Sequence, residues 1–205
     1  MKECSLRNDC RSRKMVAVIN CILNHNARDE GWARYPGINH EVIDILRKYE
    51  MGVIQMPCPE MVCLGVLRKR EAGVSIRNIL DTPEGRSRCE ELSISVVETI
   101  EEFQRNGYSV VAVLGGDVES PGCAVPAPSS EVDDQMSGCG FGVFTKALLN
   151  EMRRRDIQIP IRGIRDSARE TMQEDLNWLT NILAKSKQGG LQQYWFSHKQ
   201  IKVGE

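Results

Sequence analysis

A thiol and a carboxylate lie two residues apart in the motif Cys58-Pro59-Glu60, close enough to act on one substrate. Pro57 and Pro59 flank the cysteine, and because a residue that precedes proline is disfavoured in the α region, we expect Cys58 to be extended. Pro59 has the fixed φ suited to the first position of a helix, so Glu60 is expected in the first turn of that helix. A simpler interpretation is a stiff corner with a buried structural cysteine, because buried cysteines are common.

Three cysteines, Cys21, Cys58 and Cys123, each lie at or just past the carboxyl end of a predicted strand. In open α/β sheets, ligands bind at this edge, in the crevice where the strand order reverses. If the strand order is 2-1-3-4, the first three strands are neighbours about 4.8 Å apart, and the three thiols converge on one small centre. The other five cysteines lie in an N-terminal arm, in helices or in a glycine loop: Cys4, Cys10, Cys63, Cys89 and Cys139.

The elements that position these thiols are short β-rich runs that alternate with helical patterns. Runs that are apolar on both faces are typical of parallel strands covered on both sides. Strands that alternate with helices imply a parallel sheet with right-handed crossovers. We therefore expect an α/β fold, an open three-layer parallel sheet of flavodoxin or Rossmann type, with about four to five strands and helices on both faces. The predicted strands are residues 15–21, 52–56, 109–114 and 157–164.

Helix starts are marked by residues that cap well. Asn39, Thr82 and Ser167 are each expected to cap a helix, and Thr82 precedes a proline that opens the longest one. Cys89 continues the apolar stripe of that long helix, so packing in the core is its expected role. Residues 69–82 look irregular.

Three thiols alone are compatible with two kinds of metal centre, a zinc ion or an iron–sulfur cluster. Eight cysteines in a chain without a secretory signal are better interpreted as metal ligands, catalytic thiols or buried side chains than as disulfides. Catalytic zinc takes three protein ligands and keeps a position open. A [4Fe–4S] cluster normally takes four cysteines, and one bound by three keeps an iron open to act as a Lewis acid.

Four features in a fixed order carry a resemblance: Cys21 after an apolar strand, Cys58-Pro59-Glu60, Ser120-Pro121-Gly122-Cys123 and Gly140-Phe141-Gly142-Val143-Phe144. With them the sequence resembles the thiouracil desulfurase family and its desulfidase-related branches, over residues 15 to about 155. The chain departs from the family pattern beside the third cysteine, at Gly122 and Ala124, and these departures leave the three cysteines in place.

The resemblance implies a [4Fe–4S] cluster held by Cys21, Cys58 and Cys123, with one open iron. It implies a redox-neutral reaction in which a thiocarbonyl carbon of a thiolated nucleobase or nucleoside loses sulfide and gains oxygen from water. Glu60 would then activate water or move a proton, and Ser120 would orient the substrate or donate a hydrogen bond.

Alternatives stand beside this hypothesis. Glu60 as a first-turn carboxylate contributes only ~0.3–1 kcal/mol, and Ser120 as a turn residue needs no catalytic role. A sulfurtransferase that uses cluster-bound sulfide is the nearest functional alternative, which the extra thiols Cys63 and Cys139 favour. A non-enzymatic iron–sulfur carrier or sensor and a zinc-binding α/β domain are the others.

Composition limits the partners. The chain has 205 residues, with 27 basic and 28 acidic side chains, so no stable nucleic-acid complex held by bulk charge is expected. The clusters Arg68-Lys69-Arg70 and Arg153-Arg154-Arg155 are interpreted as solvated helix ends. No run is apolar enough to span a membrane and the N-terminus has no apolar core, so a cytoplasmic protein without a membrane partner is expected.

The predicted organisation is an arm at 1–14, a single α/β iron–sulfur domain at 15–187, and an aromatic tail at 188–205. We expect the arm to be flexible and the tail to dock on the body or on a neighbouring subunit. The loop at 24–37 is long enough to be functional, and 126–137 is interpreted as a loop or lid. His25 and His40 are expected at the surface, and Asp117 and Glu119 as loop carboxylates near the site.

Overall fold

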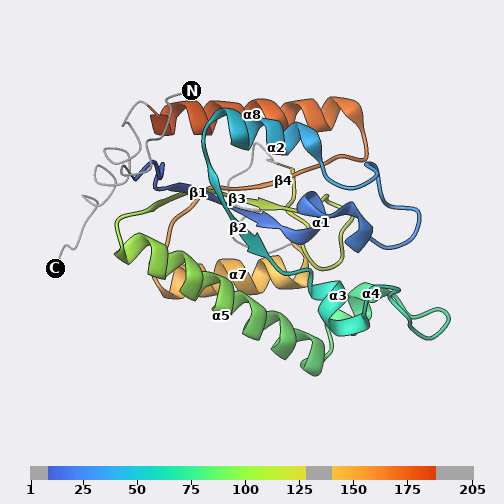
Figure 1. The fold of residues 1–205 in the computed structure, drawn as a ribbon. Helices are drawn as coiled ribbons and strands as arrows, with labels where there is room; N and C mark the ends of the chain where they lie inside the picture. Colours follow the sequence, from blue (N-terminus) through green and yellow to red (C-terminus); the bar gives the residue numbers. More distant parts are fainter. Residues whose placement is uncertain (1–8, 128–139, 188–205) are drawn as a thin grey trace.

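Four parallel strands form the centre of the computed structural model, which describes residues 9–127 and 140–187 (Figure 1). The strands are β1 (Lys14–Ile19), β2 (Gly52–Met56), β3 (Ser109–Gly115) and β4 (Ile161–Gly163). They pair in the order β2-β1-β3-β4, and every pair is parallel. The predicted order is confirmed, and the order reverses between β1 and β3.

Helices cover both faces of the sheet (Figure 1). The helices α2 (His40–Lys48) and α8 (Arg169–Lys187) pack together on one face, and α5 (Pro83–Arg105) and α7 (Val143–Arg154) pack together on the other. The predicted three-layer α/β fold is therefore confirmed. Four short helices lie at the carboxyl edge of the sheet: α1 (Asn20–Leu23), η1 (His25–Ala27), α3 (Pro59–Leu64) and α4 (Ile76–Leu80).

The core is centred on the two inner strands, β1 and β3. Val16, Val18 and Ile19 of β1 are fully buried, as is Leu114 of β3. Full burial of such side chains contributes roughly 1.5–3 kcal/mol each, so the inner strands are the rigid part of the sheet. Cys89 of α5 is also fully buried, which confirms its predicted place in the core.

Two of the three predicted caps are confirmed. Asn39 Oδ1 accepts a hydrogen bond from the Val42 amide at 3.2 Å, and Thr82 Oγ1 accepts one from the Gly85 amide at 3.1 Å. The prediction for Ser167 is wrong, because α8 begins two residues later and the Ser167 amide donates to Asp117 Oδ2 at 3.2 Å. The last helix is thereby tied to the loop after β3.

Two further predictions about local structure are wrong. The fourth strand has three residues rather than the predicted 157–164, because the Ile157 amide still donates to the Met152 carbonyl at the end of α7 and Pro160 has no amide hydrogen. Residues 69–82 contain α4, which Ser75 caps by accepting from the Asn78 amide. The predicted tail at 188–205, Cys4, Cys139 and most of the predicted lid at 126–137 lie outside the described residues.

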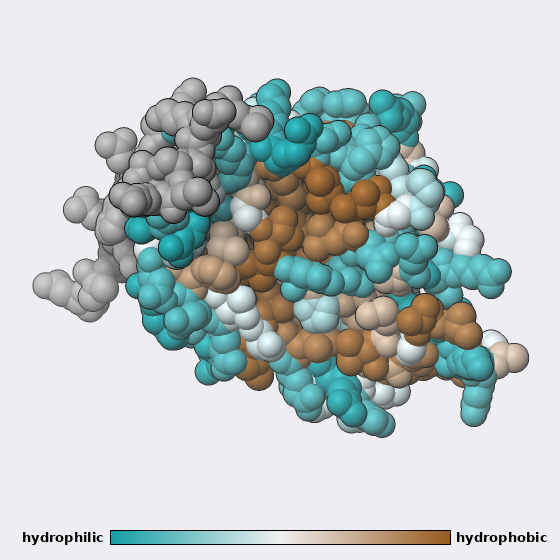
Figure 2. Space-filling model, in the orientation of Figure 1, coloured by the Kyte–Doolittle hydropathy of each residue, from teal (hydrophilic) through white to brown (hydrophobic). Residues whose placement is uncertain are grey.

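The molecular surface is charged over the helices and apolar along the edge strand. Figure 2 shows hydrophobic side chains gathered in the middle of one face, between two hydrophilic bands. Val53 of β2 and Ile94 of α5 are among the exposed large hydrophobic residues, at 38% and 37%. Among the described residues, no helix combines the length and the apolar character needed to cross a membrane.

Candidate functional site

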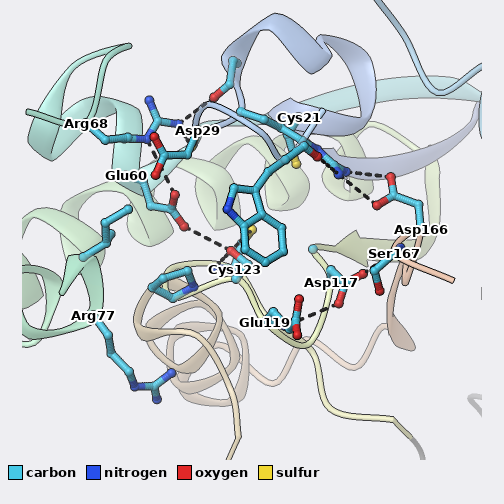
Figure 3. A pocket seen from close by; sticks show the side chains of 18 of the residues that line it. Cys21, Asp29, Glu60, Arg68, Arg77, Asp117, Glu119, Cys123, Asp166 and Ser167 are labelled. Carbon is cyan, nitrogen blue, oxygen red and sulfur yellow. Dashed lines mark hydrogen bonds and ion pairs between the residues drawn. The ribbon is translucent and has the colours of Figure 1, made fainter. Parts of the chain in front are cut away.

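A cavity of about 310 Å³ lies at the carboxyl edge of the sheet, and the three cysteines predicted to converge all line it (Figure 3). Cys58 and Cys123 are buried, at 6% and 4% exposure, and Cys21 is partly buried. The cavity adjoins the point where the strand order reverses, which is the usual ligand position in open α/β sheets.

Cys21 lies in α1, the single helical turn that follows β1, rather than at the end of the strand itself. Its thiol lines the same cavity as the thiol of Cys123 and the guanidinium of Arg28. Arg28 in turn forms a bidentate ion pair with Asp166, with N–O distances of 2.9 and 2.7 Å. A carboxylate from the other end of the chain therefore fixes the direction of the arginine that shares the cavity with Cys21.

Cys58 occupies the cap position of α3, with φ −83° and ψ 112°. The predicted extended backbone is confirmed, as are Pro59 at the start of the helix and Glu60 in its first turn. The Cys58 sulfur accepts a hydrogen bond from Arg68 Nη2 at 3.3 Å. Arg68 was interpreted as part of a solvated helix end, and that is wrong: it is 2% exposed and lines the cavity.

Cys123 lies in the loop that follows β3, and the start of α7 holds this loop. The Gly116 amide donates to the Cys123 carbonyl at 2.8 Å. The amides of Phe144 and Thr145, in the first turn of α7, donate to the carbonyl of Gly122 at 2.9 and 3.3 Å. Helix amides that have no partner within their own helix are thereby satisfied by the loop that presents the third thiol.

The two cysteine motifs pack directly on each other through a glycine. A Cβ added at Gly122 would lie 2.6 Å from Pro59 Cγ and 3.4 Å from Glu60 Cγ. Gly142 packs in the same way on the backbone of Gly122, where a Cβ would lie 2.4 Å from the carbonyl carbon. These glycines allow three segments, distant in sequence, to approach without side chains between them.

Glu60 lies between Arg68 and Cys123 in the cavity (Figure 3). Its Oε1 accepts hydrogen bonds from Ser120 Oγ at 3.1 Å and from the Gly122 amide at 3.3 Å. Ser120 Oγ also lies 3.1 Å from the Cys123 sulfur. The two predicted catalytic residues are therefore in contact with each other, and Ser120 also contacts the third thiol.

The three thiols influence each other's ionisation. The hydrogen bond from Cys123 lowers the pKa of Cys21, and the charge of Arg28 lowers it further. The same hydrogen bond and burial raise the pKa of Cys123 well above its usual value, and burial raises the pKa of Cys58 to about 11. Several thiolates therefore resist forming together in this cavity unless a positive centre binds them.

The donor set suits a soft metal centre. In the described part of the chain, no group of three His, Cys, Asp or Glu side chains is placed to hold one metal ion. Ligands of a single zinc ion must all lie about 2.0–2.3 Å from one point, whereas ligands of a [4Fe–4S] cluster bond separate iron atoms. Three thiols that line one cavity, two of them buried and with a polar side chain beside the sulfur, form a soft donor set whose chemistry fits such a cluster.

His25 is buried behind the Cys21 side of the cavity, so its predicted place at the surface is wrong, whereas His40 is exposed as predicted. The His25 Nδ1 accepts hydrogen bonds from the amides of Arg34 and Tyr35, and Nε2 lies 3.7 Å from Asp166 Oδ2. Burial and the charge of Arg28 lower the pKa of His25 to about 4. The imidazole is therefore neutral and packs behind the ion pair.

The mouth of the cavity carries an aromatic side chain and further charges. Trp32 lines it with 47% of its surface exposed, and the Arg34 guanidinium lies 6.0 Å from its ring centre. Asp117 and Glu119 line the cavity as well, which confirms their predicted place near the site. The Arg28 guanidinium donates a hydrogen bond to the Trp32 carbonyl at 3.1 Å, so the backbone of Trp32 contacts a residue of the Cys21 side of the cavity.

Three charged residues of the site were not predicted from the sequence: Arg28, Arg68 and Asp166. The length of the 24–37 loop was a usable signal for Arg28. Arg68 has a left-handed φ of 47°, which turns its side chain inward after α3, and no sequence pattern announces that turn. Asp166 meets Arg28 across 138 residues of sequence.

Comparison with known proteins gives a distant relative only. The chain is 30% identical over 103 residues to an uncharacterized protein of Methanocaldococcus jannaschii. That similarity covers 50% of this chain and 64% of the relative, so it spans less than two thirds of the relative's length. No protein-family model matches the chain, and no solved structure matches it.

Proposed function

We propose that this protein is a [4Fe–4S]-dependent desulfidase. Its substrate is a thiocarbonyl compound of the thiolated nucleobase or nucleoside class, with water as the oxygen source and sulfide as a product. The observation that carries the proposal is that three thiols and a carboxylate line one cavity, with Ser120 bridging Glu60 and Cys123. The resemblance of the motifs to the thiouracil desulfurase family supports the same function.

Cys21, Cys58 and Cys123 are the residues that would hold the cluster. Arg68 donates a hydrogen bond to the Cys58 sulfur, and the charge of Arg28 lowers the pKa of Cys21, so both arginines favour thiolates in this site. When bound, the cluster supplies a soft Lewis acid, its iron without a protein ligand, which takes up the sulfur of the substrate.

Glu60 is placed to move a proton. Its Oε1 is engaged by Ser120 and Gly122, which fixes the carboxylate and leaves Oε2 to accept a proton from water. A bond forms between the water oxygen and the thiocarbonyl carbon, and the carbon–sulfur bond breaks with its electrons on sulfur. One carbonyl compound and one hydrogen sulfide leave, so the reaction needs no oxidant or reductant.

Trp32 is suited to the planar part of such a substrate. A half-exposed indole at the mouth of the cavity offers a face on which a heterocycle stacks. Arg28 donates a hydrogen bond to the Trp32 carbonyl, so the backbone that carries the indole is linked to a residue that lines the cavity with Cys21.

Anaerobic purification with iron and sulfide analysis is the first test. We expect about four iron atoms per chain and a brown chromophore, as a [4Fe–4S] cluster requires. Stoichiometric zinc without a chromophore would leave the zinc-binding domain as the function.

Sulfide release from 2-thiouracil and 4-thiouridine, used as probes, is the second test. Glu60→Gln should keep its iron and lose turnover by about 10²–10⁴-fold, because the proton acceptor is gone. Glu119→Gln, which changes another carboxylate of the same cavity, is the control and should stay near wild type. Incorporation of sulfide instead of release would indicate the sulfurtransferase, and a loaded protein that does neither would indicate a carrier or sensor.

A further inference from the structure

The guanidinium of Arg68 has one buried N–H without a hydrogen-bond partner in the described part of the chain. Nη1 donates to the carbonyls of Gly65 at 2.7 Å and Val66 at 3.0 Å, and Nη2 donates to the Ala27 carbonyl at 2.6 Å and to Cys58 Sγ at 3.3 Å. These four contacts use four of the five donors of an arginine. Among the described residues, the Nε–H has no hydrogen-bond partner, although the side chain is only 1% exposed. A buried unsatisfied donor costs about 1–3 kcal/mol, so a ligand is expected there.

The group nearest to this N–H is the free oxygen of the catalytic carboxylate. Glu60 Oε2 lies 3.6 Å from Arg68 Nε, which is too long for a hydrogen bond. Both residues line the cavity, and in Figure 3 they point toward one another. A water molecule that contacts both groups would satisfy the Nε–H, which the direct contact with Glu60 leaves without a hydrogen bond. Such a water accepts a hydrogen bond from Arg68 and donates one to Glu60.

We propose that Arg68 Nε and Glu60 Oε2 together hold the water that attacks the thiocarbonyl carbon. This inference rests on the proposed function. The hydrogen on Nε and the lone pair on Oε2 leave the water one lone pair for the substrate, and its proton passes to Oε2 as the carbon–oxygen bond forms. Arg68 is thus a water-positioning residue, and its bond to Cys58 fixes the water site relative to a cluster ligand.

Four fixed acceptors explain why an arginine suits this position. The planar guanidinium is locked at Nη1 and Nη2, so the direction of the Nε–H follows from contacts on the other side of the group. A lysine has a single rotating ammonium and cannot satisfy those carbonyls while also presenting a donor beside Glu60. The structure therefore predicts that charge alone does not replace Arg68.

The test measures kcat, KM and iron content of Arg68→Gln in the iron-loaded protein, with 2-thiouracil as the probe. We expect kcat to fall about 100-fold, as for a misplaced reactant, with KM and iron content near wild type. Arg105→Gln is the matched control, because Arg105 is also ion-paired with a glutamate, Glu101 at 2.9 Å, but does not line the cavity. Its kcat should stay near that of the wild type.

A double variant separates a role on the water from a merely structural one. If Arg68 and Glu60 act on the same water, Arg68→Gln combined with Glu60→Gln should be no slower than Glu60→Gln alone. Losses that multiply in the double variant would overturn the proposal, because they show that the two residues act separately.

Arg68→Lys covers the case in which the glutamine variant loses iron. The lysine variant keeps a charge beside Cys58, and it should keep iron and KM while kcat still falls. A wild-type kcat in either variant, or loss of iron in both, overturns the inference, because Arg68 then serves no role or serves only to hold Cys58. A loaded wild-type protein that releases no sulfide overturns the proposed function as well, and so the two failures are distinguishable.

Discussion

The two sides of the cavity hold their cysteines by different means. On the motif side, Cys58-Pro59-Glu60 and Ser120-Pro121-Gly122-Cys123 pack closely, because Gly122 lies against the side chains of Pro59 and Glu60. On the ion-pair side, Cys21 lies on one helical turn and is held by Arg28, Asp166 and the neutral His25 behind them. The first side depends on local stiffness and close approach, and the second on charges brought together from distant parts of the chain.

The difference shows what each kind of support contributes. Proline and glycine fix the position of a thiol whatever its charge state. The ion pair instead places a positive group on the Cys21 sulfur, and this group favours the thiolate. The motif side therefore sets geometry, and the ion-pair side adds the charge balance that a buried thiolate needs.

Removal of the Asp166 carboxylate, on the ion-pair side, should have the largest effect on stability. Asp166→Ala leaves Arg28 buried beside Cys21 without its bidentate partner, so we expect the free energy of unfolding to fall by about 3–5 kcal/mol. Urea denaturation measures it. Asp44→Ala, which breaks an exposed pair with Arg47, should cost less than about 0.5 kcal/mol. Equal decreases in the free energy of unfolding of the two variants would show that the Arg28–Asp166 pair contributes no more to stability than an exposed ion pair.

A side chain added at Gly122, where the two cysteine motifs meet, should have the second-largest effect on stability. Gly122→Ala places a Cβ 2.6 Å from Pro59 Cγ, and such overpacking costs about 1–3 kcal/mol. Because the motifs separate, bound iron should fall too, as iron analysis would show. Gly37→Ala, where nothing lies within 4 Å, is the control. Full iron content and stability in Gly122→Ala would mean that the two motifs tolerate separation.

A fall in pH should lower the free energy of unfolding through His25, which lies on the ion-pair side of the cavity. The pKa of His25 is lowered to about 4 in the folded protein, from 6.5, so its contribution is complete above the unfolded value and is lost as the pH falls toward 4. Between about pH 7.5 and pH 5 the loss should be ~2 kcal/mol of the free energy of unfolding. Urea denaturation of His25→Gln should lack this component, and His40→Gln, an exposed histidine, should retain it.

The smallest effect concerns Trp32, whose carbonyl is held by Arg28. Trp32→Leu removes the aromatic face but leaves the loop, so we expect KM for 2-thiouracil to rise about fivefold, equivalent to ~1 kcal/mol, with kcat unchanged. Steady-state kinetics test this. Ile38→Ala changes another exposed residue of the same loop, outside the cavity lining, and should leave KM as it was. A KM equal to that of the wild type would exclude stacking on Trp32.

The same two sides explain how far the sequence could be interpreted. The fold, the strand order, the Cys58 corner and the place of Glu60 follow from apolar runs, prolines and first-turn preferences, which act over a few residues. Arg28, Asp166 and His25 acquire their roles only when β1 and the segment after β4 meet, and no local pattern carries that information. Arg68 was misjudged because a basic run after a helix usually faces solvent.

The strand order also sets when the site is completed during synthesis. The strands β1 and β2 precede β3 in the chain, so Cys21 and Cys58 are both synthesised before Cys123. Cys123 follows about a hundred residues after Cys21 and joins on the other flank of β1 only when β3 docks. A group held by all three thiols would therefore have its full ligand set only after more than half of the chain has been synthesised, and its insertion would belong to a late stage of folding.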